Sequence, residues 1–199
     1  MFESIISLLI ATSLLLGSPG PAPLALAATG ATCGIKKGIP FLIGILAGLV
    51  VVIIGTTVGI ASLFSTFPNI KLIVQIAGAI YIIYVAQKIA RAPALDILDE
   101  SIESSPTMID GFVLNILNPK AYAAFLAIFS QFLLPLETNL LSYLLTGTIC
   151  FMVVVFIDTI WLILGGVMRP FFESPKPARI LRVTFAILMV IAVTFSLLY

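Results

Sequence analysis

The chain alternates between long apolar runs and shorter polar segments. An α-helix needs about 20 apolar residues to cross roughly 30 Å of hydrocarbon, and six runs reach that length. They cover residues 5–28, 39–66, 71–90, 111–134, 139–166 and 179–199. The pattern therefore predicts an all-α membrane protein with six transmembrane helices.

The amino-acid composition also indicates a protein of the lipid bilayer. Of the 199 residues, 61% are hydrophobic and 10% are charged, whereas soluble domains have roughly 45–50% and 25%. The net charge of +1 gives no basis for nucleic-acid binding. The chain contains no His, so imidazole metal and proton chemistry is absent. We expect a protein of the lipid bilayer with no catalytic residues, no metal site and no cofactor, and hence not an enzyme.

One polar segment divides the chain into two halves. Residues 92–110 carry five acidic side chains and two prolines, which predicts an aqueous loop. Three apolar runs lie in 1–91 and three in 111–199, so the second half enters the membrane from the opposite side. The sequence therefore predicts one integral membrane domain, 1–199, built from two inverted three-helix halves.

Lys and Arg in short loops predict the orientation, because they are enriched on the cytoplasmic side. Eight of them share one side of the predicted topology, and Lys71 stands on the other. The eight are Lys36, Lys37, Lys88, Arg91, Arg169, Lys176, Arg179 and Arg182. We expect residues 92–110 in the cytoplasm and both termini outside it.

The first apolar run also resembles a signal peptide, with Ala25-Leu26-Ala27 in place of a cleavage site. A signal peptide begins with Lys or Arg, whereas this segment begins with Glu3 and has neither. We therefore expect the run to remain as the first transmembrane helix.

The first run of each half contains helix-breaking residues. The stretches are LLLGSPGPAPLAL at 14–26 and LNILNPKAYAAF at 114–125. Gly costs a helix about 1 kcal/mol and an interior Pro about 3 kcal/mol. Ser18-Pro19 and Asn118-Pro119 each have the form of a helix start, with an N-cap residue followed by Pro. We expect the first helix of each half to be interrupted and to begin again inside the membrane.

The two interruptions should lie at a similar depth. At 1.5 Å per residue, Ser18 lies about 20 Å from one membrane face and Asn118 about 10 Å from the other. Interrupted helices at matching positions of two halves are the best sequence indication of a transporter binding site. The alternative is that these prolines only kink packed helices.

Two charges fall within the apolar runs. Lys120 follows Asn118 by two residues, and Asp158 lies in the middle of FMVVVFIDTIWLIL. Charges at this depth are costly and usually mark a pathway or a pair. Helix N-termini and Lys120 favour a carboxylate, and Asp158 favours an ammonium group or a proton. The two charges predict a pocket for a zwitterion; the alternatives are a snorkelling Lys120 and a structural Lys120–Asp158 bridge.

The candidate substrate-binding residues follow from the breaks and the charges. Asn115 joins them because it shares helical spacing with Asn118, although an amide there also serves as a hydrogen bond between helices. The set is Ser18, Pro19, Gly20, Pro21, Asn115, Asn118, Pro119, Lys120 and Asp158.

Glycines line one face of the second run. Gly44, Gly48, Gly55 and Gly59 fall within an arc of about 60° at 100° per residue. Small residues allow close approach of another helix, so we expect this face to pack against a neighbour.

Three stretches resemble the LysE/RhtB family of amino-acid exporters. They are GSPGPAPLALAATGATCGIKKGIPFLIGILAG, IAGAIYIIYVAQKI and GFVLNILNPKAYAAFLAIFSQF, within about residues 10–132. The resemblance implies a multi-pass exporter of the bacterial cytoplasmic membrane that uses the proton-motive force to export amino acids or similar small metabolites. Matched by position, the motif residues are Pro19, Gly20, Pro21, Asn118, Pro119 and Lys120. Asp158 rests on the residue analysis alone.

Other functions remain open on sequence grounds. A cation or metal-ion exporter on the same scaffold would need several acids in the membrane, and Asp158 is the one clear candidate. A transmembrane thiol–disulfide carrier would need a cysteine where Gly20 stands, whereas Cys33 and Cys150 lie away from both breaks. A structural membrane protein is a third alternative. The expected partners are a small molecule and lipid, and homo-oligomers remain open.

Overall fold

The computed structural model describes residues 2–59 and 105–168 continuously, together with single residues between 73 and 87 and between 179 and 191. Every regular element within these residues is an α-helix. The predicted third and sixth spans, 71–90 and 179–199, lie largely outside the described residues, as does most of the predicted loop. The described residues therefore include the first, fourth and fifth predicted spans and most of the second.

The first half begins with an interrupted helix. Helices α1 (Phe2–Gly17) and α2 (Pro21–Cys33) meet at a bend of 65°, and α3 (Ile35–Val58) follows after Gly34. Gly34 has a φ of 82°, which glycine adopts at little cost. Because α3 begins at Ile35, Lys36 and Lys37 belong to its first turn. The predicted start at residue 39 was therefore four residues late.

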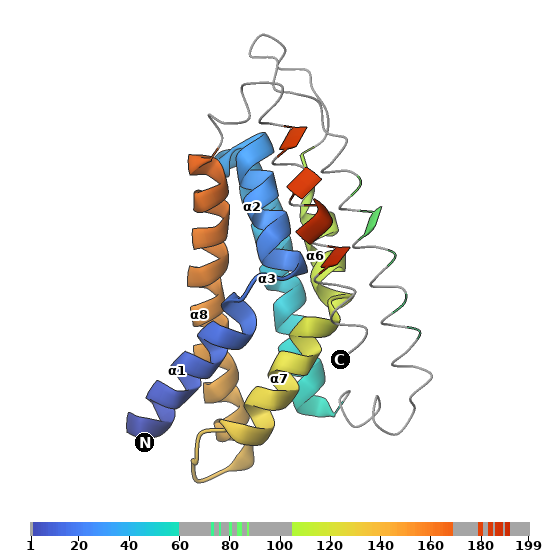
Figure 1. The fold of residues 1–199 in the computed structure, drawn as a ribbon. Coiled ribbons are helices and arrows are strands. Elements are labelled where there is room, and N and C mark those ends of the chain that lie inside the picture. Colours follow the sequence, from blue (N-terminus) through green and yellow to red (C-terminus); the bar gives the residue numbers. More distant parts are fainter. Residues whose placement is uncertain are drawn as a thin grey trace.

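The second half repeats the interruption. Helices α6 (Met108–Ile116) and α7 (Pro119–Gln131) meet at 56°, and α8 (Asn139–Val167) follows. By length and composition, α3 and α8 can each cross a membrane, and each bent pair can form one further span. The two bent pairs run in opposite directions (Figure 1). The predicted interruption in the first helix of each half is confirmed.

A capping box explains where α6 begins. The hydroxyl of Thr107 accepts the Asp110 N–H at 3.2 Å, and the Asp110 carboxylate accepts the Thr107 N–H at 2.8 Å. This reciprocal pair satisfies donors at the helix start. It sets the first residue at Met108, three residues before the predicted 111.

Glycines bring the backbones of two helix pairs into contact. A Cβ on Gly165 of α8 would overlap the carbonyl oxygen of Ala27 in α2, and one on Gly30 of α2 would overlap that of Leu162 in α8. The same reciprocal arrangement joins α3 and α6. There, Gly44 faces the Met108 carbonyl and Gly111 faces that of Phe41.

The other predicted seam positions differ. Gly48 also packs against α6, where a Cβ would lie 2.8 Å from the Phe112 carbonyl oxygen, and Gly55 is buried in α3. Gly59, however, is the C-cap of α3, with a φ of 100°. It ends the helix instead of continuing its packing face, because glycine is the residue that reaches this left-handed conformation most easily.

Large side chains fill the region where α1, α7 and the first part of α8 meet. Phe125 and Phe129 of α7 lie 5.6 Å apart between ring centroids, and Phe129 meets Tyr143 of α8 edge-on at 5.1 Å. Leu8 of α1 is fully buried in the same cluster. Packing here depends on side-chain shape, in contrast to the backbone contacts of α2 with α8.

Replacing Gly165 with Ala tests the backbone contact. We expect Gly165→Ala to lower the free energy of unfolding by about 1–3 kcal/mol, because neither backbone can move without disturbing its helix. Gly147→Ala in the same helix is the control, since its Cβ would meet a side-chain methyl group of Ile53 at 3.0 Å and no backbone atom of another helix. Thermal unfolding of the purified proteins in detergent measures both. Equal shifts would contradict a backbone contact at Gly165.

Candidate functional site

The first break places α2 two residues later than the sequence predicts. Gly20 is the N-cap, in an extended conformation with φ −164°, and Pro21 is the first helical residue. The predicted cap, Ser18, was wrong: its hydroxyl donates instead to the Leu15 carbonyl at 3.3 Å, at the end of α1. The reason is the missing N–H groups of the prolines. A helix capped at Ser18 would need the N–H of Pro23 for the Pro19 carbonyl, and proline has none. The first helical bond therefore runs from the Leu24 N–H to the Gly20 carbonyl at 3.0 Å.

The second break follows the prediction. Asn118 caps α7, and its side-chain oxygen accepts the Lys120 N–H at 3.1 Å. Pro119 occupies the first helical position, where its missing N–H is tolerated. A new half-helix therefore begins at this point inside the membrane-spanning pair.

Lys120 joins the two breaks. Its ammonium group donates to the backbone oxygen of Ser18 at 2.6 Å and to the Ser18 hydroxyl at 2.9 Å. Gly20 makes room for this contact, because a Cβ there would lie 2.9 Å from Lys120 Nζ. The Lys120 side chain is partly buried, and its ammonium group is held at the first break, which does not support the alternative of a snorkelling side chain.

Asp158 reaches the same place from α8. Its side chain is 3% exposed and lines a cavity together with Lys120. The two opposite charges therefore line the same cavity. Within the described part of the chain, however, Asp158 forms neither an ion pair nor a hydrogen bond, so the structural Lys120–Asp158 bridge is not formed in this conformation.

The cavity is small and its polar lining converges from several helices. The first turns of α2 and α7 contribute to it, as do buried amides of the second break. Its lining comprises Leu16, Ala22, Pro23, Leu49, Asn115, Asn118, Lys120, Ala121, Val154 and Asp158. Its volume of about 20 Å³ has room for one water molecule, whereas small-molecule pockets have about 300–1,000 Å³. This conformation is therefore closed around the charges.

Two further side chains hold the surroundings in place. The Asn115 amide donates to the Ile45 carbonyl of α3 at 2.9 Å, so it joins helices as well as lining the cavity. Trp161 Nε1 donates to the Gly17 carbonyl at the end of α1, at 3.3 Å. Sequence reasoning missed Trp161. Its signal was its position three residues after Asp158, which places both on one side of α8.

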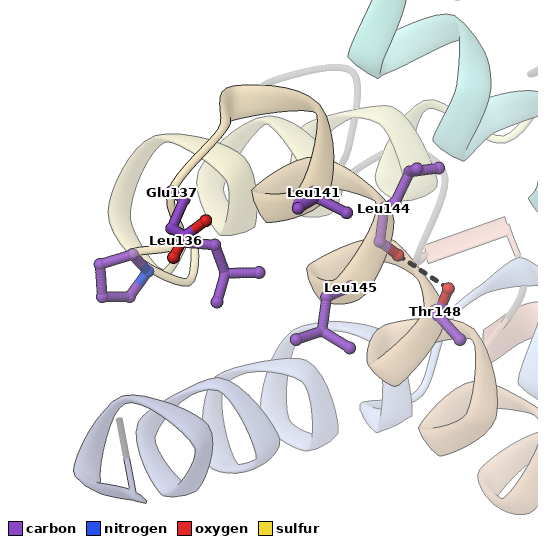
Figure 2. A pocket seen from close by; sticks show the side chains of 7 residues that line it. Leu136, Glu137, Leu141, Leu144, Leu145 and Thr148 are labelled. Carbon is purple, nitrogen blue, oxygen red and sulfur yellow. Dashed lines mark hydrogen bonds between the residues drawn. The ribbon is translucent and has the colours of Figure 1, made fainter.

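A larger open groove lies at the start of α8 and has a different character. It measures about 590 Å³ and is lined by Pro135, Leu136, Glu137, Leu141, Leu144, Leu145 and Thr148. Figure 2 shows its leucines and the Thr148 hydroxyl, which donates to the Leu144 carbonyl of its own helix at 2.7 Å. Because Glu137 is the one charged residue in this lining, the groove lacks the two opposite charges of the cavity at the breaks.

The two cysteines lie apart from the breaks. Cys150 is buried in α8 and contacts the Thr12 hydroxyl of α1 at 3.3 Å, while Cys33 ends α2. Both are free thiols. They occupy packing positions and do not adjoin the charged cavity.

Comparison with known proteins adds to this geometry. The family model described as LysE type translocator matches residues 13–199. The chain belongs to the LysE type translocator family. Membership covers nearly the whole sequence and confirms the resemblance seen in its motifs. A LysE type translocator is a transporter and not an enzyme, and its apolar helices make it a multi-pass membrane protein.

Curated relatives carry efflux names. The chain is 26% identical to the homoserine/homoserine lactone efflux protein of Salmonella typhimurium, over 96% of this chain and 94% of the relative. It is 30% identical to the leucine efflux protein of Enterobacter sp., over 65% of this chain and 64% of the relative. No solved structure matches the chain significantly.

Proposed function

We propose that this LysE type translocator exports amino acids or similar small zwitterionic metabolites across the bacterial inner membrane, coupled to proton influx. One observation carries the proposal: Lys120 and Asp158 line a single cavity between two half-helix starts. Two of the relatives described above are named for the efflux of homoserine and leucine, both amino acids. The chemistry of the cavity and these names support the same class of substrate.

The carboxylate of such a substrate would bind on the side of the half-helix starts. The positive end of a helix dipole attracts anions, and the first turns of α2 and α7 both line the cavity. In α2, Ala22 supplies the N–H of this turn, since Pro21 and Pro23 have none. Lys120 adds a full positive charge at the start of α7.

Asp158 supplies the opposite charge. A buried carboxylate without a hydrogen-bond donor is costly, and no described residue donates to it. Neutralisation by a proton or by a substrate ammonium removes that cost. Asp158 is therefore the group in this cavity that can link export to proton movement.

Transport also requires the closed cavity to open. Its volume of about 20 Å³ excludes an amino acid, so one side of the site must separate. The two breaks are the natural hinges, because their residues have already left the helical conformation. The Lys120–Ser18 hydrogen bonds join these hinges and must break or shift in the process.

Everted membrane vesicles that express the protein test the function. We expect respiration to drive accumulation of at least one of the twenty amino acids, and a protonophore to abolish it. Vesicles with Glu137→Gln should behave as the wild type, because this acid lies in the groove at the start of α8. Accumulation of inorganic cations with no amino-acid signal would contradict the proposal.

The proposed orientation places α3's first turn on the cytoplasmic side and Glu137 outside. In a chain with Cys33→Ala and Cys150→Ala, a cysteine is introduced at Lys37 or Glu137, both of which are exposed. A membrane-impermeant maleimide should label Glu137→Cys in intact spheroplasts. It should label Lys37→Cys only after the membrane is permeabilised. The reverse pattern would invert the orientation.

A further inference from the structure

The carbonyl end of α1 already binds an ammonium group. This helix ends at Gly17, and the next residue, Ser18, offers its backbone oxygen and hydroxyl to Lys120 Nζ at 2.6 and 2.9 Å. The C-terminal end of a helix carries partial negative charge and favours cations. The neighbouring Gly17 carbonyl is bonded to Trp161. The two Ser18 oxygens therefore form a small, defined acceptor site for a cation.

Lys120 adopts this contact although the cavity that its side chain lines also holds a buried carboxylate. Asp158 is only 3% exposed, and no described residue donates a hydrogen bond to it. The lysine thus satisfies a backbone carbonyl, while the acid remains unbonded beside it. In a direct ion pair, Lys120 and Asp158 would neutralise each other. Here the ammonium group is bound at Ser18 and the carboxylate is left for another cation or a proton.

We infer that the two Ser18 oxygens are the subsite for the substrate's ammonium group, and that Lys120 fills this subsite with its own ammonium in the closed conformation. On binding, the substrate ammonium takes the place of Lys120. The released lysine then pairs with the substrate carboxylate, and Asp158 is left to carry the proton. This inference rests on the proposed function and names its ligand class, a primary amine that also bears a carboxylate.

Gly20 determines whether an ammonium group fits at Ser18. A Cβ at this position would lie 2.9 Å from Lys120 Nζ and 2.9 Å from its Cδ. Any ammonium bound to the Ser18 oxygens would meet the same methyl group. Gly20 is therefore a specificity-determining position of the subsite, although it offers no side chain of its own.

Two variants of the full-length purified protein distinguish this arrangement from a structural lysine. The probes are the amino acid that the vesicle screen exports best and its α-carboxamide, which keeps the ammonium but has no carboxylate. Lys120→Met keeps most of the side-chain volume and removes the competing ammonium. We expect it to bind the amide about tenfold more tightly, the effect of losing one competing hydrogen bond to a charged group. The amino acid gains the same relief but loses the lysine that pairs with its carboxylate, so its binding should be no tighter than in the wild type.

Gly20→Ala should act differently from Lys120→Met. Its methyl group crowds the subsite itself. Added to Lys120→Met, where no lysine competes, it should weaken the binding of both probes about tenfold. Calorimetric titration measures each affinity, and thermal unfolding confirms that each variant is folded. If Lys120→Met does not fold, Lys120→Gln takes its place in both measurements, because it also lacks the ammonium group.

Several outcomes would overturn the inference. Unchanged or weaker binding of the amide to folded Lys120→Met would show that the lysine does not compete with the substrate ammonium. Unchanged amide binding when Gly20→Ala is added to folded Lys120→Met would place the ammonium elsewhere. These results differ from failure of the proposed function, in which the wild-type protein exports no amino acid at all.

Discussion

Lys120→Met and Asp158→Asn should each reduce export by about 100-fold or more while the protein still folds and enters the membrane. Each change removes one of two opposite charges that line the cavity between the breaks. Loss of one partner from a buried charged contact costs about 2–5 kcal/mol, and about 2.7 kcal/mol corresponds to 100-fold. Export in everted vesicles and the amount of protein in the membrane measure the effect.

The double variant separates a binding site from a structural pair. If the charges only stabilise each other, each single change leaves a buried charge unpaired and destabilises the fold. Lys120→Met with Asp158→Asn would then regain both stability and export. We expect instead a folded double variant that does not transport. A folded double variant with wild-type export would contradict the assignment of these residues to substrate or proton binding.

Restoring a continuous helix across the first break should abolish export completely. Pro19→Ala, Gly20→Ala and Pro21→Ala together remove three residues that cost a helix about 1–3 kcal/mol each. A helix can continue through the remaining Pro23, as α3 continues through Pro40. The 65° bend between α1 and α2 would be lost. In a continuous helix, the Ser18 carbonyl would accept the N–H of Ala22, so Lys120 would lose its backbone acceptor.

Pro40→Ala is the control for this triple change. Pro40 also lies inside a helix, α3, but the helix continues through it from Ile35 to Val58. Its replacement should leave export within about twofold of the wild type, since a surface change away from such features is worth about 0.5 kcal/mol or less. Vesicle export compares the two. Full activity of the triple variant would show that the first break is not needed for transport.

Local rules predicted the parts of the site that depend on neighbours in sequence. Proline and glycine within apolar runs indicated both breaks, and Asn118 before Pro119 indicated the start of α7. The same reasoning was wrong at Ser18, because it considered the first X-Pro pair alone. Gly20-Pro21 and Ala22-Pro23 follow it, and the missing N–H of Pro23 moves the helix start to Pro21.

Contacts between distant segments were harder to predict. Lys120 donates to the backbone oxygen of Ser18. Every residue has such an oxygen, so no residue type in the sequence indicates this acceptor. Trp161 likewise bonds the Gly17 carbonyl. The pattern of four glycines in α3 indicated close packing, yet it could not show that α6 was the neighbour of Gly44 and Gly48. Such pairings depend on the tertiary arrangement of helices and not on the periodicity of either one.

The reciprocal glycine contact between α2 and α8 has a consequence for genetics. A damaging substitution in an ordinary core can be rescued when a facing side chain becomes smaller. At Gly165 the opposing atom is the carbonyl oxygen of Ala27, which no codon change at that position removes. A selection for revertants of Gly165→Ala should therefore recover glycine at the original site, and compensating changes in α2 should be rare.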